Sequence, residues 1–415
     1  MDCTPLFIKA QKASRGLVDL EETVIDRLLM LLAERTENEI PFLLSENEKD
    51  LSLTDKDDMK YDRLQLTGDR IKSIAFDIRR VSELPSPIGK VISEFKKSNG
   101  LLITRITVPF GVVGAIYEAR PNVTFDVFSL CLKSGNACIL KGGSDALSSN
   151  SAIVSVIRRV LHECNLDENV ITLLPPGRKE TIQLLNARGF VDLLIPRGSK
   201  GLIDYVRKNS SVPVIETGAG ICHTYFDEYG DIEKGRKIIN NAKNRRVSVC
   251  NSLDCLIVHK SRLKDLPELL QLCAESEVEI FADNDTFAAL NHKYPASLLK
   301  RAAKGSFGTE FLAKKMALKT VASLQEALDH ISEFGSGHSE AIISENAGRV
   351  DNFLKMVDAS AVYSNASTAF TDGAEFGLGA EIGISTQKLH ARGPMALEEL
   401  TTYKWIIRGD GQIRP

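Results

Sequence analysis

The sequence predicts an α/β fold with two domains built on parallel sheets and a small additional β segment. The chain has 415 residues, which at about 150 residues per domain indicates two or three domains. From Gly111 onward, short apolar runs alternate with helical patterns, as expected for parallel strands joined by helices. Hydrophobic residues make up 43% and charged residues 26%, a composition that argues against disordered, collagen-like and coiled-coil proteins.

The chain is expected to begin with helices over residues 1 to about 95. Apolar residues at helical spacing include Leu64, Ile71, Ile74 and Ile78, while Pro85 and Pro87 interrupt the region. The next segment, Leu101–Val108, is rich in residues that favour strands. It therefore predicts an extended ribbon.

Two series of apolar runs predict the two sheets. The first series has helical patterns between its members and comprises Val112–Tyr117, Ala137–Leu140, Val170–Leu174, Val191–Ile195 and Val212–Ile215. The second follows residue 251 and comprises Cys255–Val258, Val278–Phe281, Met316–Val321, Ala341–Ile343 and Ala361–Tyr363. A last strand, Thr401–Ile407, has no helix after it, so its edge needs a cover such as another subunit.

Charge and cysteine content limit the classes of function. The 52 Lys and Arg residues nearly balance the 55 Asp and Glu residues, which argues against a nucleic-acid partner. The N-terminal residues lack a secretory signal and no apolar run approaches the roughly 20 residues of a membrane span, so a cytoplasmic protein with no membrane partner is expected. Eight cysteines should then stay reduced, and without CxxC or HExxH spacing no metal site is predicted.

Two basic strand-to-helix turns are candidates for binding a phosphate-bearing ligand. Lys141–Ser144 and Arg197–Gly201 each follow a predicted strand and offer small residues beside a positive charge. Ordinary turns remain the alternative, and no GxGxxG fingerprint is present. Among the cysteines, Cys250 follows two arginines in a polar stretch, where positive charge favours the nucleophilic thiolate; a structural role stays open.

Several longer motifs resemble the gamma-glutamyl phosphate reductase family of the aldehyde dehydrogenase superfamily. They occur in order between about Arg15 and Arg414: Tyr117–Thr124, Cys222–Tyr225, Arg246–Asn251, Phe334–Ile342 and His390–Leu400. Phe334 and Val247 depart from the family's usual residues, but neither is a reacting group. The resemblance implies an aldehyde-dehydrogenase-like fold, a β extension that mediates homo-oligomerisation, and a reductase.

The resemblance also implies roles for individual residues. Cys250 would be the nucleophile that forms a thioester, and Asn122 would donate to the oxyanion. Glu216 falls where aldehyde-oxidising relatives have a general base, a role that a reductase does not need, so its function stays open. Lys141, Ser199 and Glu310 would bind the cofactor, expected to be NADPH because Lys141 suits a 2′-phosphate. The candidates for binding substrate are Arg246, Arg120 and Arg392.

The implied reaction is NADPH-dependent reduction of L-glutamyl 5-phosphate to L-glutamate 5-semialdehyde and phosphate, the second step of proline biosynthesis. The alternative is another acylating aldehyde dehydrogenase that acts on a different acyl phosphate or acyl thioester. A two-lobed binding protein and a thiol hydrolase are more distant alternatives. The expected domains are an NADPH-binding domain (1–230, with 365–395 returning to it), a catalytic domain (231–364) and a β extension (96–110 with 396–415).

Overall fold

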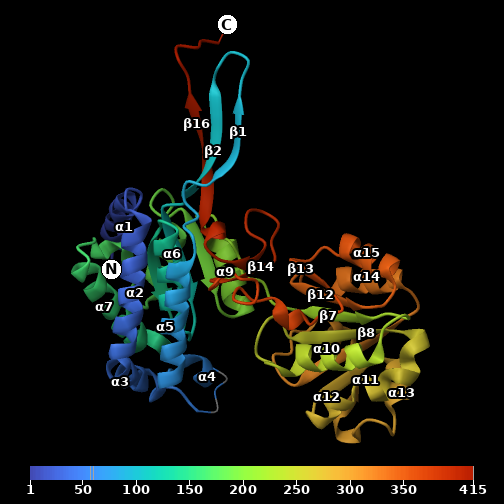
Figure 1. Ribbon diagram of the computed structural model, residues 1–415. Coiled ribbons are helices and arrows are strands. Elements are labelled where there is room, and N and C mark those ends of the chain that lie inside the picture. The colour runs from blue at the N-terminus through green and yellow to red at the C-terminus, as the bar shows by residue number, and fades with distance from the viewer. Residues whose placement is uncertain (57, 59, 415) are drawn as a thin grey trace. The chain divides into compact units, whose positions relative to one another are not determined.

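The computed structural model describes residues 1–56, 58 and 60–414, which form two compact units (Figure 1). The first unit comprises Met1–Thr217, Gly377–Gly383 and Met395–Pro415, and the second comprises Gly218–Phe376 and Ile384–Pro394. Two short paired strands, β14 (Gly383–Ser385) and β15 (Gly393–Met395), lie where the chain passes from one unit to the other. The expected boundaries at 230 and over 365–395 therefore differ from those of the structure.

The first unit begins with helices, as predicted, but they end earlier than residue 95. Apolar side chains bury one face of the longest of these helices; the helices are α1 (Thr4–Leu17), α2 (Glu22–Asn38), α3 (Ile40–Leu51), α4 (Tyr61–Leu64) and α5 (Gly68–Glu83). Pro85 and Pro87 end the helical region because the residue before a proline avoids the helical conformation. Residues 91–96 then form strand β1 (Val91–Lys96), whereas the sequence predicts helix to about residue 95 and the β extension from residue 96.

A four-stranded parallel sheet forms the centre of the first unit. Its strands lie in the order β5-β4-β3-β6, with bounds β3 (Val112–Tyr117), β4 (Ala137–Gly142), β5 (Ile171–Leu173) and β6 (Leu193–Arg197). The accompanying helices are α6 (Asn122–Lys133), α7 (Leu147–Glu163), α8 (Arg178–Leu185) and α9 (Lys200–Asn209). The predicted strand at 212–215 is only an isolated bridge between Val214 and Leu194, because Pro213 has no N–H to donate to a ladder.

A three-stranded antiparallel sheet extends from the body of the first unit (Figure 1). It consists of β1, β2 (Leu102–Pro109) and β16 (Thr401–Arg408), with β2 in the middle. Arg105 of β2 lies over the rings of Tyr403 and Trp405, at 4.9 and 5.5 Å from their centroids. This sheet joins residues 91–109 to the last part of the chain.

The second unit contains a seven-stranded parallel sheet with the order β10-β9-β11-β8-β7-β12-β13. The strands are β7 (Cys222–Phe226), β8 (Leu253–His259), β9 (Glu279–Ala282), β10 (Leu299–Arg301), β11 (Lys315–Val321), β12 (Ser339–Ile343) and β13 (Ala361–Ser364). Sequence analysis missed β7, which pairs with β8 and β12. The second unit therefore begins at Gly218 rather than at residue 231.

Helices cover both faces of this sheet. One face packs against α10 (Ile232–Asn244), α11 (Leu266–Leu269), α12 (Gln271–Glu275) and α13 (Asn284–Leu290), and the other against α14 (Leu324–Phe334) and α15 (Ala347–Met356). The predicted helix at 263–274 is broken into a 3-10 turn and two short helices. Within the described ranges, no helix is long and apolar enough to cross a membrane.

Candidate active site

Cys250 lies in the loop that connects α10 to β8 and is half-buried. The backbone of this loop rests directly on the segment that leads into β7. A Cβ on residue 220 would lie 1.6 Å from the carbonyl oxygen of Cys250, so only Gly220 fits there. The Cys222 thiol donates to the same carbonyl oxygen at 3.2 Å. Contacts with this segment therefore fix the position of the Cys250 backbone.

Asn251 fixes the other side of the Cys250 loop. Its side-chain amide donates to the carbonyl oxygens of Ala369 and Thr371 at 3.3 and 3.0 Å, and Thr368 donates to its backbone oxygen at 2.8 Å. These groups are buried, so the hydrogen bonds form without competition from water. The motif residue next to Cys250 thus has a structural role, which holds the backbone of the Cys250 loop in place.

Exposure separates Cys250 from most of the other cysteines. None of the eight, all of which are described, forms a disulfide bond, and only Cys250 and Cys164 are not buried. Burial raises the pKa of the Cys222 and Cys138 thiols well above its ordinary value, which keeps them protonated and unreactive. Burial also raises the pKa of Cys164.

Glu310 lies close to the Cys250 loop within the second unit. Its Oε1 accepts a hydrogen bond from the backbone N–H of Gly220 at 3.0 Å. Gly220 is the residue on which the Cys250 carbonyl rests. The structure therefore brings together two of the predicted site residues, Cys250 and Glu310, through one glycine.

A buried ion pair supports both Glu310 and the Cys250 loop. Lys243 in the last turn of α10 lies 3.6 Å from Asp254 in β8, and both side chains are almost fully buried. Asp254 accepts from the backbone N–H of Phe311 at 3.1 Å, and Lys243 donates to the carbonyl of Lys315 at 2.8 Å. Burial raises the pKa of Asp254 to about 7, although Lys243 opposes this shift.

Sequence analysis missed this pair. Lys243 and Asp254 come just before and just after the Cys250 loop, and each binds the segment that follows Glu310. The available signal was Asp254 itself, because a carboxylate at the start of a buried apolar run needs a partner.

The two predicted arginines of the second unit differ in their surroundings. Arg246 is exposed in the Cys250 loop. Arg392 binds Asp358 at 2.8 Å, and Lys388 binds the same carboxylate. Arg246 is therefore more available for an anionic ligand than Arg392.

Asn122 is the first residue of α6 in the first unit, directly after Pro121. Its amide nitrogen donates to Asp126 at 3.0 Å, which uses one of its two N–H groups. Burial, and then the negative charge of Asp77, raise the pKa of Asp126 to about 7. Upstream, Arg120 follows Ala119, which has a φ of 40°, a strained conformation of the kind found at functional sites.

The two basic turns lie at the carboxyl edge of the four-stranded sheet, on either side of β3. Lys141 is near the end of β4 and Ser199 follows β6, and both strands pair with β3. Lys141 is buried and donates to the carbonyl of Gly142 at 3.1 Å; burial lowers its pKa. Ser199 caps α9 by accepting from the N–H of Leu202 at 3.3 Å. Both turns have the strand-to-helix form that the sequence predicts.

Glu216 lies near the end of the first continuous part of the first unit and is half-buried. Its carboxylate is 3.7 Å from Arg207 of α9. This contact is a weak surface ion pair and does not identify a general base.

Comparison with known proteins identifies the family. No protein-family model matches the sequence. The chain is 60% identical over 408 residues to a gamma-glutamyl phosphate reductase of Bacteroides thetaiotaomicron, covering 98% of each chain. It also superposes on the gamma-glutamyl phosphate reductase of Thermotoga maritima with a TM-score of 0.95, at 38% identity and full coverage of both chains.

A more distant match extends the likeness of fold. An acetylating aldehyde dehydrogenase of Geobacillus thermoglucosidasius matches with a TM-score of 0.72 and 16% identity, over 99% of this chain and 97% of that one. The fold is thus aldehyde-dehydrogenase-like, as the sequence motifs implied. On the strength of the close relatives, this chain belongs to the gamma-glutamyl phosphate reductase family of oxidoreductases.

Proposed function

We propose that the protein reduces L-glutamyl 5-phosphate to L-glutamate 5-semialdehyde and inorganic phosphate with NADPH, in the second step of proline biosynthesis. The observation that carries the proposal is the half-buried Cys250, held in a fixed loop within a chain 60% identical to a named reductase of this type. We also propose that the protein is located in the cytoplasm, because the reaction needs a free thiolate and thiols stay reduced in that compartment.

Cys250 would act as the nucleophile. Its thiolate attacks the acyl carbon, the C–O bond to phosphate breaks, and a thioester forms on the sulfur. NADPH, when bound, supplies the hydride. The resulting tetrahedral species then collapses to the aldehyde, and Cys250 leaves as a thiolate ready for the next cycle.

Hydrogen-bond donors would stabilise the developing negative charge on the substrate oxygen. The backbone N–H of Cys250 is one proposed donor, and the second N–H of the Asn122 amide is the other. Asp126 accepts the first N–H of Asn122 and so restricts the rotation of that amide. Loss of one such donor typically slows a reaction about 10²–10³-fold.

The first unit offers a site for a nicotinamide cofactor at the carboxyl edge of its sheet. Lys141 supplies a buried positive charge, and the turn at Ser199 opens a helix whose first N–H groups suit a phosphate. Asp145 has a buried Oδ1 without a hydrogen-bond partner among the described residues, which a ribose hydroxyl would satisfy. Glu310 of the second unit is proposed to bind the nicotinamide ribose.

Arginines would bind the two acidic ends of the substrate. Arg246 is the strongest candidate for the phosphate, because it is exposed in the same loop as Cys250. Arg120 and Arg392 are proposed to bind the carboxylate. Arg392 is the weaker candidate, because its guanidinium already pairs with Asp358. Glu216 needs no role as a base, since reduction involves no hydrolytic water.

The β extension supports a proposed homo-oligomer. β1 and β16 are edge strands, and several of their large apolar side chains are exposed: Val91, Ile92, Phe95, Tyr403, Trp405 and Ile407. Exposed strand edges with apolar side chains are normally covered, and a second copy of the chain would do so symmetrically.

Phosphate-dependent reduction of NADP⁺ by glutamate semialdehyde tests the proposal in the reverse direction. Cys250→Ala should lose at least about 10³-fold in rate, whereas Cys164→Ser, which changes the other partly exposed cysteine, should retain activity. Full activity in Cys250→Ala would remove the cysteine from the mechanism. A reaction that needs coenzyme A instead of phosphate would favour the acyl-thioester alternative.

A further inference from the structure

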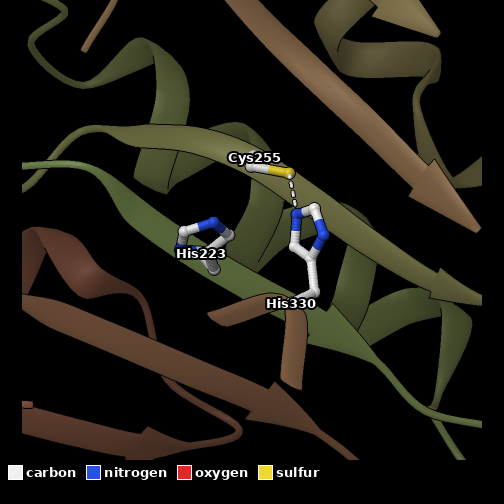
Figure 2. A group of neighbouring side chains, drawn as sticks. All are labelled: His223, Cys255 and His330. Carbon is white, nitrogen blue, oxygen red and sulfur yellow. Dashed lines mark hydrogen bonds between the residues drawn. The ribbon is translucent and has the colours of Figure 1, made fainter. Parts of the chain in front are cut away.

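Three side chains that bind metals in many proteins meet in the interior of the second unit (Figure 2). His223 comes from β7, Cys255 from the neighbouring β8, and His330 from α14, which covers that face of the sheet. His223 and Cys255 are fully buried, and His330 is only 6% exposed. One nitrogen or sulfur atom from each lies within 4.8 Å of the other two.

One polar atom of this cluster is unsatisfied among the described residues. Glu340 accepts from Nδ1 of His223 at 3.0 Å, but the other ring nitrogen, Nε2, is buried without a hydrogen-bond partner among the described residues. Figure 2 shows a ring nitrogen of His223 facing the space beside Cys255 and His330. An unsatisfied buried nitrogen costs stability, and a ligand at this position would remove that cost.

We propose that His223, Cys255 and His330 form a binding site for a zinc ion. Two imidazoles and a thiolate are ligands that zinc prefers, with Zn–N near 2.0 Å and Zn–S near 2.3 Å. Those bond lengths place a nitrogen and a sulfur about 3.5 Å apart on a tetrahedral ion. Here the sulfur of Cys255 and Nε2 of His330 are 3.7 Å apart, so these two atoms need almost no movement.

Glu340 completes the second layer of the proposed site. A carboxylate that accepts from the distal nitrogen of a ligating histidine fixes the tautomer and increases the basicity of the ligating nitrogen. The hydrogen bond between Glu340 and His223 has this arrangement. The pair therefore orients Nε2 of His223 toward the proposed ion before it binds.

A cavity next to the cluster gives an ion a way in and leaves room for a fourth ligand. It has a volume of about 490 Å³, and its lining includes His330, two lysines and three acidic residues: Lys304, Lys319, Glu326, Asp329 and Glu333. The three carboxylates outnumber the two lysines, so the lining carries a net negative charge, which favours cations over anions. Because His330 is shared by the cavity and the cluster, water from the cavity can occupy the remaining position on the ion.

Zinc in this site would connect α14 to two strands of the sheet. Binding displaces into solvent the proton of the Cys255 thiol and the proton on Nε2 of His223, and the three ligands become held by one ion. Cys255 follows Cys250 by five residues, but it lies in β8 rather than in the Cys250 loop, and zinc binding requires no step of the proposed reduction. Its effect would be on the stability of the second unit.

Cobalt and zinc titrations of the chelator-treated, full-length protein test the proposal. We expect one high-affinity equivalent, and with Co²⁺ a thiolate-to-metal charge-transfer band together with the visible bands of a tetrahedral site. Zinc should also raise the unfolding temperature. Cys250→Ala and Cys273→Ser should keep the stoichiometry and the band.

Cys255→Ser and His330→Gln should lose the charge-transfer band and the zinc-dependent rise in unfolding temperature, while circular dichroism shows that they remain folded. Absence of stoichiometric binding to the wild-type protein would overturn the proposal without reference to any variant. Binding that disappears in Cys250→Ala but persists in Cys255→Ser would also overturn it, since the metal would then lie at the reactive cysteine.

Discussion

The sheets of the two units differ in what they bury. In the first unit, β3 contributes no charged residue and the sheet buries one lysine, Lys141 of β4, while the buried Lys133 on α6 reaches carboxylates that are partly exposed, Glu22 and Asp26. In the second unit, β7, β8 and β12 place the ionisable side chains of His223, Asp254 and Glu340 inside the core, and Asp254 pairs with Lys243 of α10. Buried charges lower stability unless they are paired. The charged groups in the second sheet therefore lower the stability of that unit, but their contacts fix the geometry near the Cys250 loop.

Removal of the buried cation in each unit should give the largest effect. Lys243→Met leaves Asp254 inside the second unit without its cation, and we expect a loss of about 3 kcal/mol of unfolding free energy. Lys133→Met leaves carboxylates that water already reaches, so its cost should be about 1 kcal/mol or less. Urea unfolding of both variants measures the difference.

The double variant Lys243→Met with Asp254→Asn serves as the control for that comparison. It removes both charges and should recover part of the stability lost in the single variant. Equal destabilisation by Lys243→Met and Lys133→Met would show that the two units do not differ in this respect.

The second largest effect should be a pH dependence of stability that comes from Asp126 in the first unit. The folded pKa of Asp126 is about 7, above the ordinary value of 3.8, so folding favours its neutral form. The contribution of Asp126 to the free energy of unfolding is fully present below pH 3.8 and is lost as the pH rises through 7. Because the side chain is partly exposed, we expect a loss of about 2 kcal/mol over this range.

Asp126→Asn should remove that part of the pH dependence. The free energy of unfolding, measured at several pH values between 4 and 8, should fall more steeply in the wild type than in the variant. Parallel curves for the two proteins would show that Asp126 titrates normally. Asn122→Ala, which removes its hydrogen-bond donor, provides a second comparison.

The smallest expected effects concern helix caps, one in each unit. Asp231 accepts from the N–H of Lys234 at 2.8 Å at the start of α10, and Ser199 accepts from Leu202 at 3.3 Å at the start of α9. We expect Asp231→Ala to cost about 1 kcal/mol and Ser199→Ala about half as much, because the aspartate bond is shorter and charged.

The same two variants separate a structural role from a role in binding. Ser199→Ala should raise KM for NADPH if the proposed cofactor site is correct, whereas Asp231→Ala should leave it unchanged. Steady-state kinetics with varied NADPH distinguish these outcomes. An unchanged KM in both would restrict Ser199 to helix capping.

Apolar runs predicted most strands of both sheets, because strands covered on both faces carry few polar residues. The same reasoning missed β7, whose Cys222-His-Thr-Tyr-Phe226 sequence places polar groups in the core. Some of these groups have long-range partners, such as Glu340 for Nδ1 of His223, which lies far along the chain. Periodicity cannot detect a strand that depends on distant contacts. Because β7 is not predicted, the predicted domain boundary falls at residue 230 instead of before Gly218.

The candidate site was predictable where it follows motifs and unpredictable where it depends on packing. Cys250 and Glu310 appear in recognisable segments, and the structure connects them through Gly220. The support from Lys243 and Asp254 could not be read from spacing, since their common partner segment follows Glu310. Second-layer contacts of this kind arise from the fold rather than from any local pattern.

The three-stranded extension has a consequence for how the chain is made. β1 and β2 leave the ribosome early, but their partner β16 is almost the last segment to be synthesised. At 5–20 residues per second, β2 waits about 15–60 s for this neighbour. All seven strands of the second unit lie between residues 222 and 364, so that sheet can form during the interval. A nascent chain therefore presents an open strand edge to its neighbours on the same polysome, where identical chains are most concentrated.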